Sequence, residues 1–356
     1  MSIFKDVLSS EESLFKNEIA LDYSFIPKII PYREVQQRYI ANCIKPLFNE
    51  RNGKNLFIYG KPGIGKTVAC KHIFKEMEET TDDILPLYIN CWQKNTSYKI
   101  IIELCELLGY KFTQNKSSED LFKVIKDILN KKNAVFCFDE IDKLQDFDFL
   151  YTILEEIYRK TILLITNYKG YIDELDHRIK SRLTAELLEF KPYSASETKG
   201  ILKQRKSYAF VPGVWEESAF ELVSNKAAEL SDLRAGLYLL RESGLAAEME
   251  SSKRIRDEHA KKAIEKLDTF SIKKSTDLEE DEQSILGIVR ENPDSKIGDL
   301  FKIYRNKGGS SAYKTFQRKI NKLNMNNFVT VEKIAGGKEG KTTIVRSAKT
   351  KKLSEF

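Results

Sequence analysis

Short apolar runs alternate with amphipathic stretches between residues 50 and 190. Each run has the length of a buried strand, whereas the stretches between the runs repeat apolar residues at helical spacing. Strands that alternate with helices predict an α/β fold with a parallel sheet covered by helices on both faces. The expected strands are Leu56–Tyr59, Ile84–Cys91, the run Asn133–Asp142, Thr161–Asn167 and Glu186–Phe190, and the expected helices are Glu34–Asn49, Val68–Met77, Ser97–Gly109 and Leu121–Asn130.

The strand pattern stops at Lys191, and only helical periodicity continues to Leu267. Pro192 marks this boundary, and Ser194 followed three residues later by Glu197 is typical of a capping box at the start of a helix. These features predict a small all-helical unit that would cover one edge of the sheet. Residues 1–26 are also polar with a helical pattern.

The C-terminal part begins with a polar, charged stretch that predicts a linker over residues 268–281. Three short helical patterns follow, and then two strands joined by the glycine-rich basic hairpin 335–341. This order is typical of a winged helix. The predicted division is an α/β core with its N-terminal segment over 1–190, a helical lid over 191–267, the linker over 268–281 and a winged-helix domain over 282–356.

Charge is distributed unevenly along the 356 residues. From Lys296 onward fifteen Lys or Arg face four Asp or Glu, a local charge of +11 that leaves −5 for the first 295 residues of a chain with net charge +6. A basic tail on a mildly acidic body predicts that the C-terminal domain meets a polyanion.

Cysteine spacing and hydropathy argue against a disulfide-rich protein, a cysteine-based metal site and a membrane-spanning protein. The five cysteines are odd in number and show no metal or disulfide spacing, which predicts buried, reduced thiols. No apolar run approaches the length that spans a bilayer, and the N-terminus lacks the apolar core of a signal peptide. We therefore expect a cytoplasmic protein without membrane contact.

A glycine-rich turn closed by Lys-Thr follows the first expected strand, and its spacing from Gly60 to Thr67 matches a P-loop. Lys66 would reach the outer phosphates of a nucleotide, and the Thr67 hydroxyl would ligate Mg²⁺. The alternative is a glycine-rich turn with a solvated lysine. The residues expected to cradle the phosphates are Gly63, Ile64, Gly65, Lys66, Thr67 and Val68.

Polar residues end two later strands at the same predicted edge of the sheet. Asp139 can hold Mg²⁺ and Glu140 can orient and deprotonate an attacking water, since carboxylates at the end of a central strand face the ligand. Asn167 is placed to hold that water or the γ-phosphate. The alternative is a buried strand that merely ends in solvated acids.

The third helix of the predicted winged helix has one apolar and one polar, basic face. Its polar face, together with the hairpin, predicts binding to double-stranded DNA, with the helix in the major groove. A solvated basic face or a protein-binding winged helix is the alternative. The candidate DNA-binding residues are Tyr313, Lys314, Gln317 and Arg318, with Lys322 on the same polar face, and Lys338 and Lys341 in the hairpin.

Taken together, these motifs resemble the archaeal Orc1/Cdc6 replication initiators, which are AAA+ ATPases. Gly60–Thr67 resembles Walker A, Asp139–Glu140 resembles Walker B, and Asn167 resembles the sensor 1 asparagine. The segment Phe25–Glu34 resembles the part of that family that walls the adenine.

Further roles follow only from this resemblance. Arg182 corresponds to the arginine finger that acts on the nucleotide of a neighbouring subunit, with Arg178 as a second candidate, and Arg234 corresponds to the sensor 2 arginine on the γ-phosphate. Tyr193 and Arg205 correspond to a nucleotide-contacting pair in the lid. Residues 111–120 correspond to an initiator-specific helix that touches DNA in relatives.

The chain departs from the family in two places. Ser231 stands where a glycine usually precedes the sensor 2 aspartate, and the wing carries lysines where relatives have glycine-arginine repeats. Lysine keeps the charge but lacks the planar fork of arginine.

The function expected from the motifs and the resemblance is that of an ATP-dependent initiator that binds replication-origin DNA. It would bind ATP or ADP with Mg²⁺, hydrolyse ATP slowly as a regulatory step, and meet a replicative helicase and other initiator subunits on the chromosome. One alternative is an AAA+ regulator of transposition or plasmid maintenance. Another is a transcription regulator in which the bound nucleotide is structural.

Overall fold

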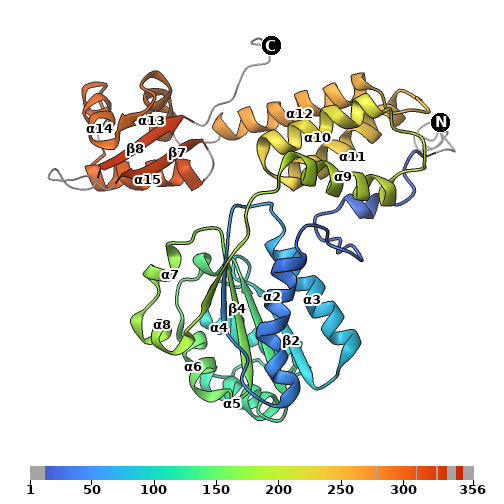
Figure 1. Ribbon diagram of the computed structural model, residues 1–356. Coiled ribbons are helices and arrows are strands. Elements are labelled where there is room, and N and C mark those ends of the chain that lie inside the picture. The colour runs from blue at the N-terminus through green and yellow to red at the C-terminus, as the bar shows by residue number, and fades with distance from the viewer. Residues whose placement is uncertain (1–12, 277–279, 310, 326–327, 335–341, 348–356) are drawn as a thin grey trace. The chain divides into compact units, whose positions relative to one another are not determined.

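The computed structural model describes residues 13–276, 280–309, 311–325, 328–334 and 342–347. The chain divides into two compact units, Met1–Ile264 and Glu265–Phe356. The first unit contains a parallel sheet and a group of helices, and the second contains helices with a small antiparallel sheet (Figure 1).

The sheet of the first unit has five parallel strands in the order β2-β3-β4-β1-β5. Their bounds are β1 Leu56–Tyr59, β2 Ile84–Asn90, β3 Asn133–Asp139, β4 Lys160–Thr166 and β5 Glu186–Glu189. All five predicted strands are confirmed. Every residue of the central strand β3 is buried, as expected for a strand covered on both faces.

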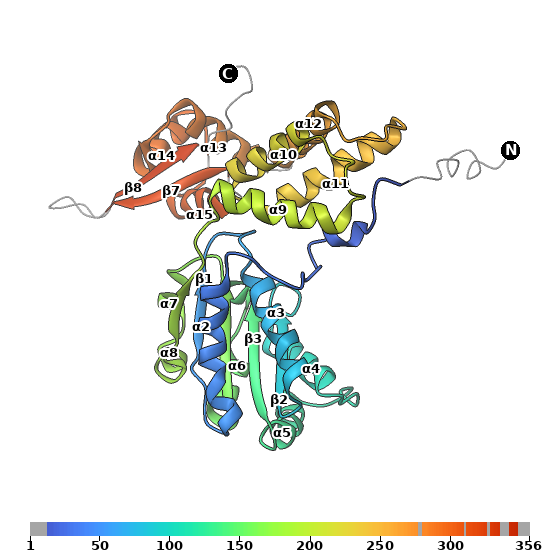
Figure 2. The same ribbon diagram turned by 45° about the vertical axis from the view of Figure 1, so that its right-hand side comes forward.

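Helices cover both faces of this sheet (Figure 2). Alternate residues of each strand point to opposite faces, so Phe57 and Ile58 of β1 belong to two different cores. One face is covered by α2 Glu34–Ile44 and α3 Lys66–Thr80. The other is covered by α4 Ser97–Leu107, α5 Ser118–Leu129, α6 Asp148–Glu156 and α8 His177–Leu183.

Short turns complete the core and correct two expectations. Of residues 13–26, only Glu18–Leu21 are helical, as the 3₁₀ turn η1, and residues 1–12 lie outside the described ranges. Residues 111–117 form a loop and not a helix, because Asn115 takes a left-handed backbone conformation with φ 58° and Ser117 caps α5. The remaining short elements are η2 Lys45–Asn49, η3 Ile141–Lys143 and α7 Tyr171–Glu174.

The helical lid consists of α9 Ala195–Ala209, α10 Glu217–Leu230, α11 Leu233–Met249 and α12 Asp257–Thr276. The predicted capping box is present, since Ser194 accepts from the Glu197 amide and the Glu197 carboxylate accepts from the Ser194 amide. Helix α12 continues through residues 268–276, so most of the predicted linker is helical. No glycine or proline interrupts this stretch, and the helix has no reason to end at residue 267.

In the second unit, the three predicted helices are α13 Glu280–Glu291, α14 Ile297–Asn306 and α15 Tyr313–Met325. The antiparallel strands are β6 Ser295–Lys296, β7 Val329–Ile334 and β8 Thr342–Ser347, in the order β6-β8-β7. A separate apolar core joins the helices to the strands, with Tyr304 and Phe316 fully buried. This arrangement is consistent with the predicted winged helix, while Lys338 and Lys341 lie outside the described residues.

Two other expectations concern the whole chain. All five cysteines are buried and free, which confirms the prediction of reduced thiols. Within the described ranges, no helix combines the length and the apolar character needed to cross a bilayer.

Candidate functional site

The P-loop connects the end of β1 to the start of α3, and its glycines hold conformations that other residues disfavour. Gly63 and Gly65 have φ values of 74° and 90°. A Cβ atom on Gly63 would lie 2.0 Å from Oδ1 of Asp232 in the lid. The loop therefore needs glycine both for its turn and for its close approach to the lid.

Lys66 lies buried at the beginning of α3 and contacts the end of β4. Its ammonium donates to the carbonyls of Gly60 at 2.7 Å and Lys61 at 2.8 Å, and to Oδ1 of Asn167 at 2.9 Å. Burial lowers the pKa of Lys66 to about 8, although nearby carboxylates oppose the shift. Lys66 and Asn167, which are 101 positions apart in the sequence, thus meet at one edge of the sheet.

Thr67 and Asp139 also meet at this edge. The Thr67 hydroxyl donates to Oδ2 of Asp139 at 2.6 Å, and the Tyr88 hydroxyl donates to the same oxygen at 2.8 Å. Asp139 is 3% exposed. A hydroxyl and a buried carboxylate side by side are the oxygen donors that Mg²⁺ prefers, so these residues fit the predicted ion.

Glu140 follows Asp139 in a left-handed backbone conformation, with φ 56°. Burial raises the pKa of Glu140, and the neighbouring carboxylates Asp139 and Asp142 raise it further. Asp142 itself accepts from the Thr166 hydroxyl at 3.0 Å, next to Asn167. A carboxylate with a raised pKa is a stronger base, which suits the predicted role of Glu140 toward water.

The lid touches the P-loop at the start of α11. The Leu233 amide donates to the carbonyl of Gly63 at 3.3 Å. Asp232 caps the helix and binds the Arg234 guanidinium at 3.2 Å through Nε and at 3.1 Å through Nη2. Ser231 has φ 53°, so serine keeps the left-handed turn that glycine usually provides at this position.

Arg33 makes a second connection between the lid and the P-loop. It is 4% exposed and donates to the carbonyls of Ile64 and Lys191, and its guanidinium lies 3.8 Å from the ring centroid of Tyr193. Sequence reasoning missed the contact of Tyr88 with Asp139 and the contacts of Arg33 with Ile64 and Tyr193, because neither pattern is part of a local motif for phosphate binding.

In the second unit, helix α15 presents a mixed surface. Phe316, Ile320 and Leu323 are fully buried, whereas Lys314 and Arg318 are exposed on the opposite face. Of the other candidates, Tyr313 packs edge-on against Phe301 at 5.0 Å, Gln317 is half-buried, and Lys322 forms an ion pair with Glu282 at 2.6 Å.

Comparison with known proteins gives the family. Residues 50–169 match the model of an AAA domain, and residues 199–265 match the Cdc6 AAA+ ATPase-type lid domain. The chain is 30% identical to ORC1-type DNA replication protein 1 of Archaeoglobus fulgidus, over 96% of this chain and 90% of that protein. The chain belongs to the ORC1-type DNA replication protein family. The protein of the same name from Sulfurisphaera tokodaii is also 30% identical, over 97% and 94% of the two chains.

Solved structures agree with this ORC1-type fold. The Aeropyrum pernix ORC1 protein, in a complex with DNA, matches with a TM-score of 0.69 and 25% identity, over 95% of this chain and 94% of that chain. The Aeropyrum pernix ORC2 protein, in ADPNP-ADP complexes, matches with a TM-score of 0.71 and 19% identity over 94% of each chain, which shows the fold alone. The resemblance to Orc1/Cdc6 AAA+ proteins is confirmed.

The arginines whose roles came from the ORC1-type resemblance have other contacts in this chain. Arg205 is buried and donates to the carbonyls of Ala20 and Phe25, both at 3.1 Å, and burial lowers its pKa to about 10. Arg182 on α8 forms an ion pair with Glu155 and lies 4.9 Å from the ring centroid of Tyr151. Arg178 pairs with Asp176. Their roles toward nucleotide stay predictions.

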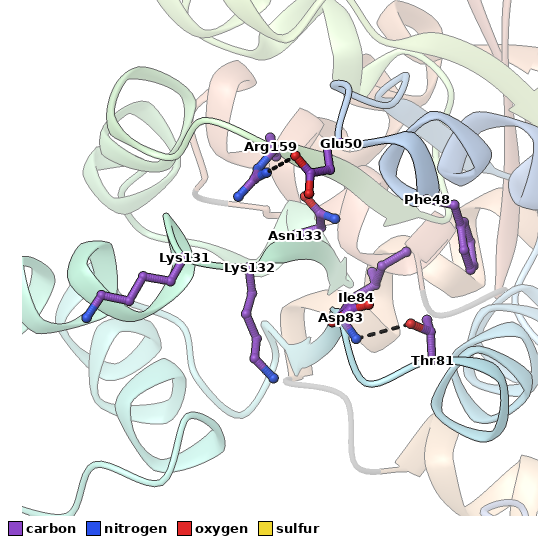
Figure 3. Close-up of a pocket in the computed structure, with 9 residues that line it drawn as sticks. All are labelled: Phe48, Glu50, Thr81, Asp83, Ile84, Lys131, Lys132, Asn133 and Arg159. Carbon is purple, nitrogen blue, oxygen red and sulfur yellow. Dashed lines mark hydrogen bonds and ion pairs between the residues drawn. The ribbon is translucent and has the colours of Figure 1, made fainter.

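One hollow of this ORC1-type core lies away from the P-loop. It has a volume of about 250 Å³ and opens where β2 and β3 begin, at the edge of the sheet opposite the P-loop (Figure 3). Arg159 and Glu50 form an ion pair in its wall. Because parallel strands place their carboxyl ends at the ligand, this hollow is separate from the nucleotide site.

Proposed function

We propose that this protein is an ATP-dependent initiator that binds replication-origin DNA. The observation that carries the proposal is the convergence of Lys66 with Asn167 and of Thr67 with Asp139 at one edge of the sheet. It occurs in a chain that aligns over nearly its whole length with ORC1-type replication proteins.

In this proposal, ATP binds with its phosphates along the main-chain amides of residues 63–68. Lys66 exchanges its carbonyl and amide contacts for phosphate oxygens, since a buried ammonium binds an anion better than neutral oxygens. Thr67 and Asp139 hold Mg²⁺, which neutralises phosphate charge when bound. Tyr193, Arg205 and Arg234 complete the site from the lid.

Hydrolysis in this proposal depends on Glu140 and Asn167. Glu140 accepts a proton from the attacking water, and Asn167 holds that water or the γ-phosphate. Arg182 lies exposed on α8, where it can reach nucleotide bound to a neighbouring initiator subunit. A lone subunit therefore hydrolyses ATP slowly, and the reaction acts as a regulatory step.

The DNA contact in this proposal is made by α15 and the wing. Lys314 and Arg318 are one turn apart and exposed, so both can reach phosphates or base edges in a major groove. Tyr313, Gln317, Lys338 and Lys341 complete the interface. Binding to the chromosome places the protein in the cytoplasm, where a replicative helicase and other initiator subunits are its partners.

The experiment that tests the proposal maps where the protein sits on the genome and repeats the mapping with two variants. Lys66→Ala removes nucleotide binding, whereas Lys314→Ala with Arg318→Ala lowers DNA affinity and reduces its salt dependence, because each lysine or arginine on a phosphate releases counterions. Origin-centred occupancy that the double variant loses supports the proposal. Occupancy confined to promoters remote from any origin contradicts it.

Glu140→Gln separates binding from hydrolysis. The variant keeps nearly the same shape but cannot accept the proton, so it binds ATP and loses turnover. Unchanged hydrolysis in the purified variant removes Glu140 from the mechanism.

A further inference from the structure

Arg33 precedes α2 and lies buried between three segments of the first unit. Its Nε and Nη2 atoms donate to the carbonyl of Ile64 at 3.3 and 3.0 Å, and Nη2 also donates to the carbonyl of Lys191 at 2.6 Å. Ile64 lies in the middle of the P-loop. Lys191 lies in the connector between β5 and α9, residues 190–194, which leads from the sheet to the lid.

Two aromatic rings of the same connector enclose the guanidinium. Its Cζ lies 3.8 Å from the centroid of Tyr193 and 5.2 Å from that of Phe190. The Tyr193 hydroxyl is in turn close to the P-loop, because a Cβ atom on Gly65 would lie 3.0 Å from it. A shift of the connector therefore moves both the Lys191 carbonyl that Arg33 binds and the Tyr193 ring beside Gly65.

The backbone before Arg33 is also held in place. Tyr32 has φ 64°, a left-handed conformation that is costly for a residue with a bulky side chain, and its amide donates to Oε1 of Glu34 at 3.1 Å. Strain of this kind persists only where the surrounding contacts fix it. The N-terminal segment thus presents Arg33 at a defined position.

We infer that Arg33 is a positioning residue that couples the orientation of the lid connector to the conformation of the P-loop. It acts through Ile64 and Tyr193 and does not touch the nucleotide, because its side chain is almost fully enclosed. This inference rests on the proposed function, in which the P-loop binds ATP.

A lysine cannot replace Arg33 in this arrangement. The guanidinium spans two carbonyls while its flat face packs on an aromatic ring, and an ammonium offers neither the planar fork nor the stacking surface. A positive charge alone therefore cannot hold the connector against the P-loop. We expect Arg33→Lys to weaken nucleotide binding, as Arg33→Met does.

The test measures nucleotide affinity, thermal unfolding and DNA affinity on the full-length chain. ADP and ATP are titrated in the presence of Mg²⁺ into wild type, Arg33→Met and Arg33→Lys. Arg38→Met is the matched control, because Arg38 is an exposed arginine on α2, the helix that Arg33 precedes. We expect affinity to fall roughly tenfold to a hundredfold in both Arg33 variants, since small displacements of binding groups have effects of this size. The Kd of the Arg38→Met control for each nucleotide should stay within about twofold of the wild-type value.

Thermal unfolding without nucleotide separates positioning from a purely structural role. A structural role lowers the melting temperature and leaves the Kd of the folded protein unchanged, whereas positioning weakens nucleotide binding by folded protein and leaves DNA affinity intact. If Arg33→Met does not fold, Arg33→Lys carries the test with the same criterion. A Tyr193→Leu background gives a further check, because the Arg33 variants lose less affinity there if the two residues act together.

The outcomes are distinguishable from those of the proposed function. Wild type that binds no nucleotide removes the proposed function. Wild type that binds nucleotide alongside folded Arg33 variants of equal affinity overturns only the inference about Arg33.

Discussion

Asp281 in the second unit gives the most detailed prediction, because one carboxylate joins three other segments. It accepts from the Tyr304 hydroxyl at 2.6 Å, the Ser311 hydroxyl at 3.0 Å and the Lys319 ammonium at 2.8 Å. These donors belong to α14, to the segment just before α15, and to α15 itself. Asp281→Ala removes all three contacts at once.

The expected loss of stability follows from the exposure of these groups. Tyr304 is 1% exposed, so its hydroxyl loses its acceptor away from water, at a cost of about 1–2 kcal/mol, although it still accepts from the Ser311 amide at 3.2 Å. The Lys319 ammonium, on a side chain that is 15% exposed, loses one charge-assisted hydrogen bond, which adds about 1 kcal/mol. Ser311 is half-buried and adds little. The sum is about 2–3 kcal/mol. This corresponds to a roughly 30- to 150-fold larger equilibrium constant for unfolding of the second unit.

Hydrogen exchange followed by mass spectrometry on the full-length chain measures this change and localises it. Amides of α13, α14 and α15 should exchange roughly 30- to 150-fold faster in Asp281→Ala, whereas amides of β3 should keep their wild-type rates. Tyr304→Phe removes one donor and should give about a fivefold increase. Asp299→Ala, at an exposed ion pair with Lys302, is the control without a change.

The pH dependence has a defined sign. Burial raises the pKa of Asp281, but hydrogen bonds from Lys319, Tyr304 and Ser311 outweigh it and lower the pKa below its usual 3.8. The stabilisation is therefore present above the unfolded-state pKa and disappears as the pH falls through the lowered folded-state value. Exchange rates in Asp281→Ala that stay within threefold of wild type at neutral pH would refute this reasoning.

Three further predictions concern the first unit. The difference in urea-unfolding free energy between Lys66→Met and wild type, measured without nucleotide, should shift in favour of wild type as the pH rises from about 7 to about 9. The folded pKa of Lys66, about 8, lies below the unfolded value, so the cost of burying its charge shrinks above that pH. A difference that does not change with pH would contradict this. Ser231→Gly should stabilise the chain by about 0.5–1 kcal/mol in the same assay by relieving its left-handed backbone, and a destabilised variant would show that the hydroxyl matters more. Tyr88→Phe should lower the free energy of unfolding by about 1 kcal/mol, because Asp139 loses one of its two hydroxyl donors. The same loss should raise the Mg²⁺ concentration that nucleotide binding requires. A variant with the Mg²⁺ requirement of wild type would exclude a role for Tyr88 in the site.

The sheet and its P-loop could be predicted because their signals are local. Strands such as β1 and β3 are short apolar runs, and the glycines between Gly60 and Gly65 are needed by the loop itself. The meeting of Lys66 with Asn167 followed from one rule, that the carboxyl ends of parallel strands share an edge. The contacts of Arg33 with Ile64 and Tyr193 could not be predicted, since they join residues whose spacing has no periodicity.

The failures have physical reasons as well. A polar composition suggested a linker at 268–281, but polar residues without glycine or proline are compatible with an exposed helix, and α12 continues to Thr276. Of the helix that the family resemblance implied at 111–120, only Ser118–Asp120 are helical, as the start of α5. Asn115 adopts the left-handed conformation that ends helices, which the resemblance gave no means to foresee.

The complete burial of β3 has a consequence for genetics. All seven of its residues lie inside the protein, so a polar or smaller residue there lowers the amount of folded protein that a cell maintains. A random screen for loss of function should therefore return two classes of allele. Changes in 133–138 should reduce abundance, whereas changes at Glu140, just beyond the strand, should leave a normal amount of inactive protein that can interfere with the wild-type copy.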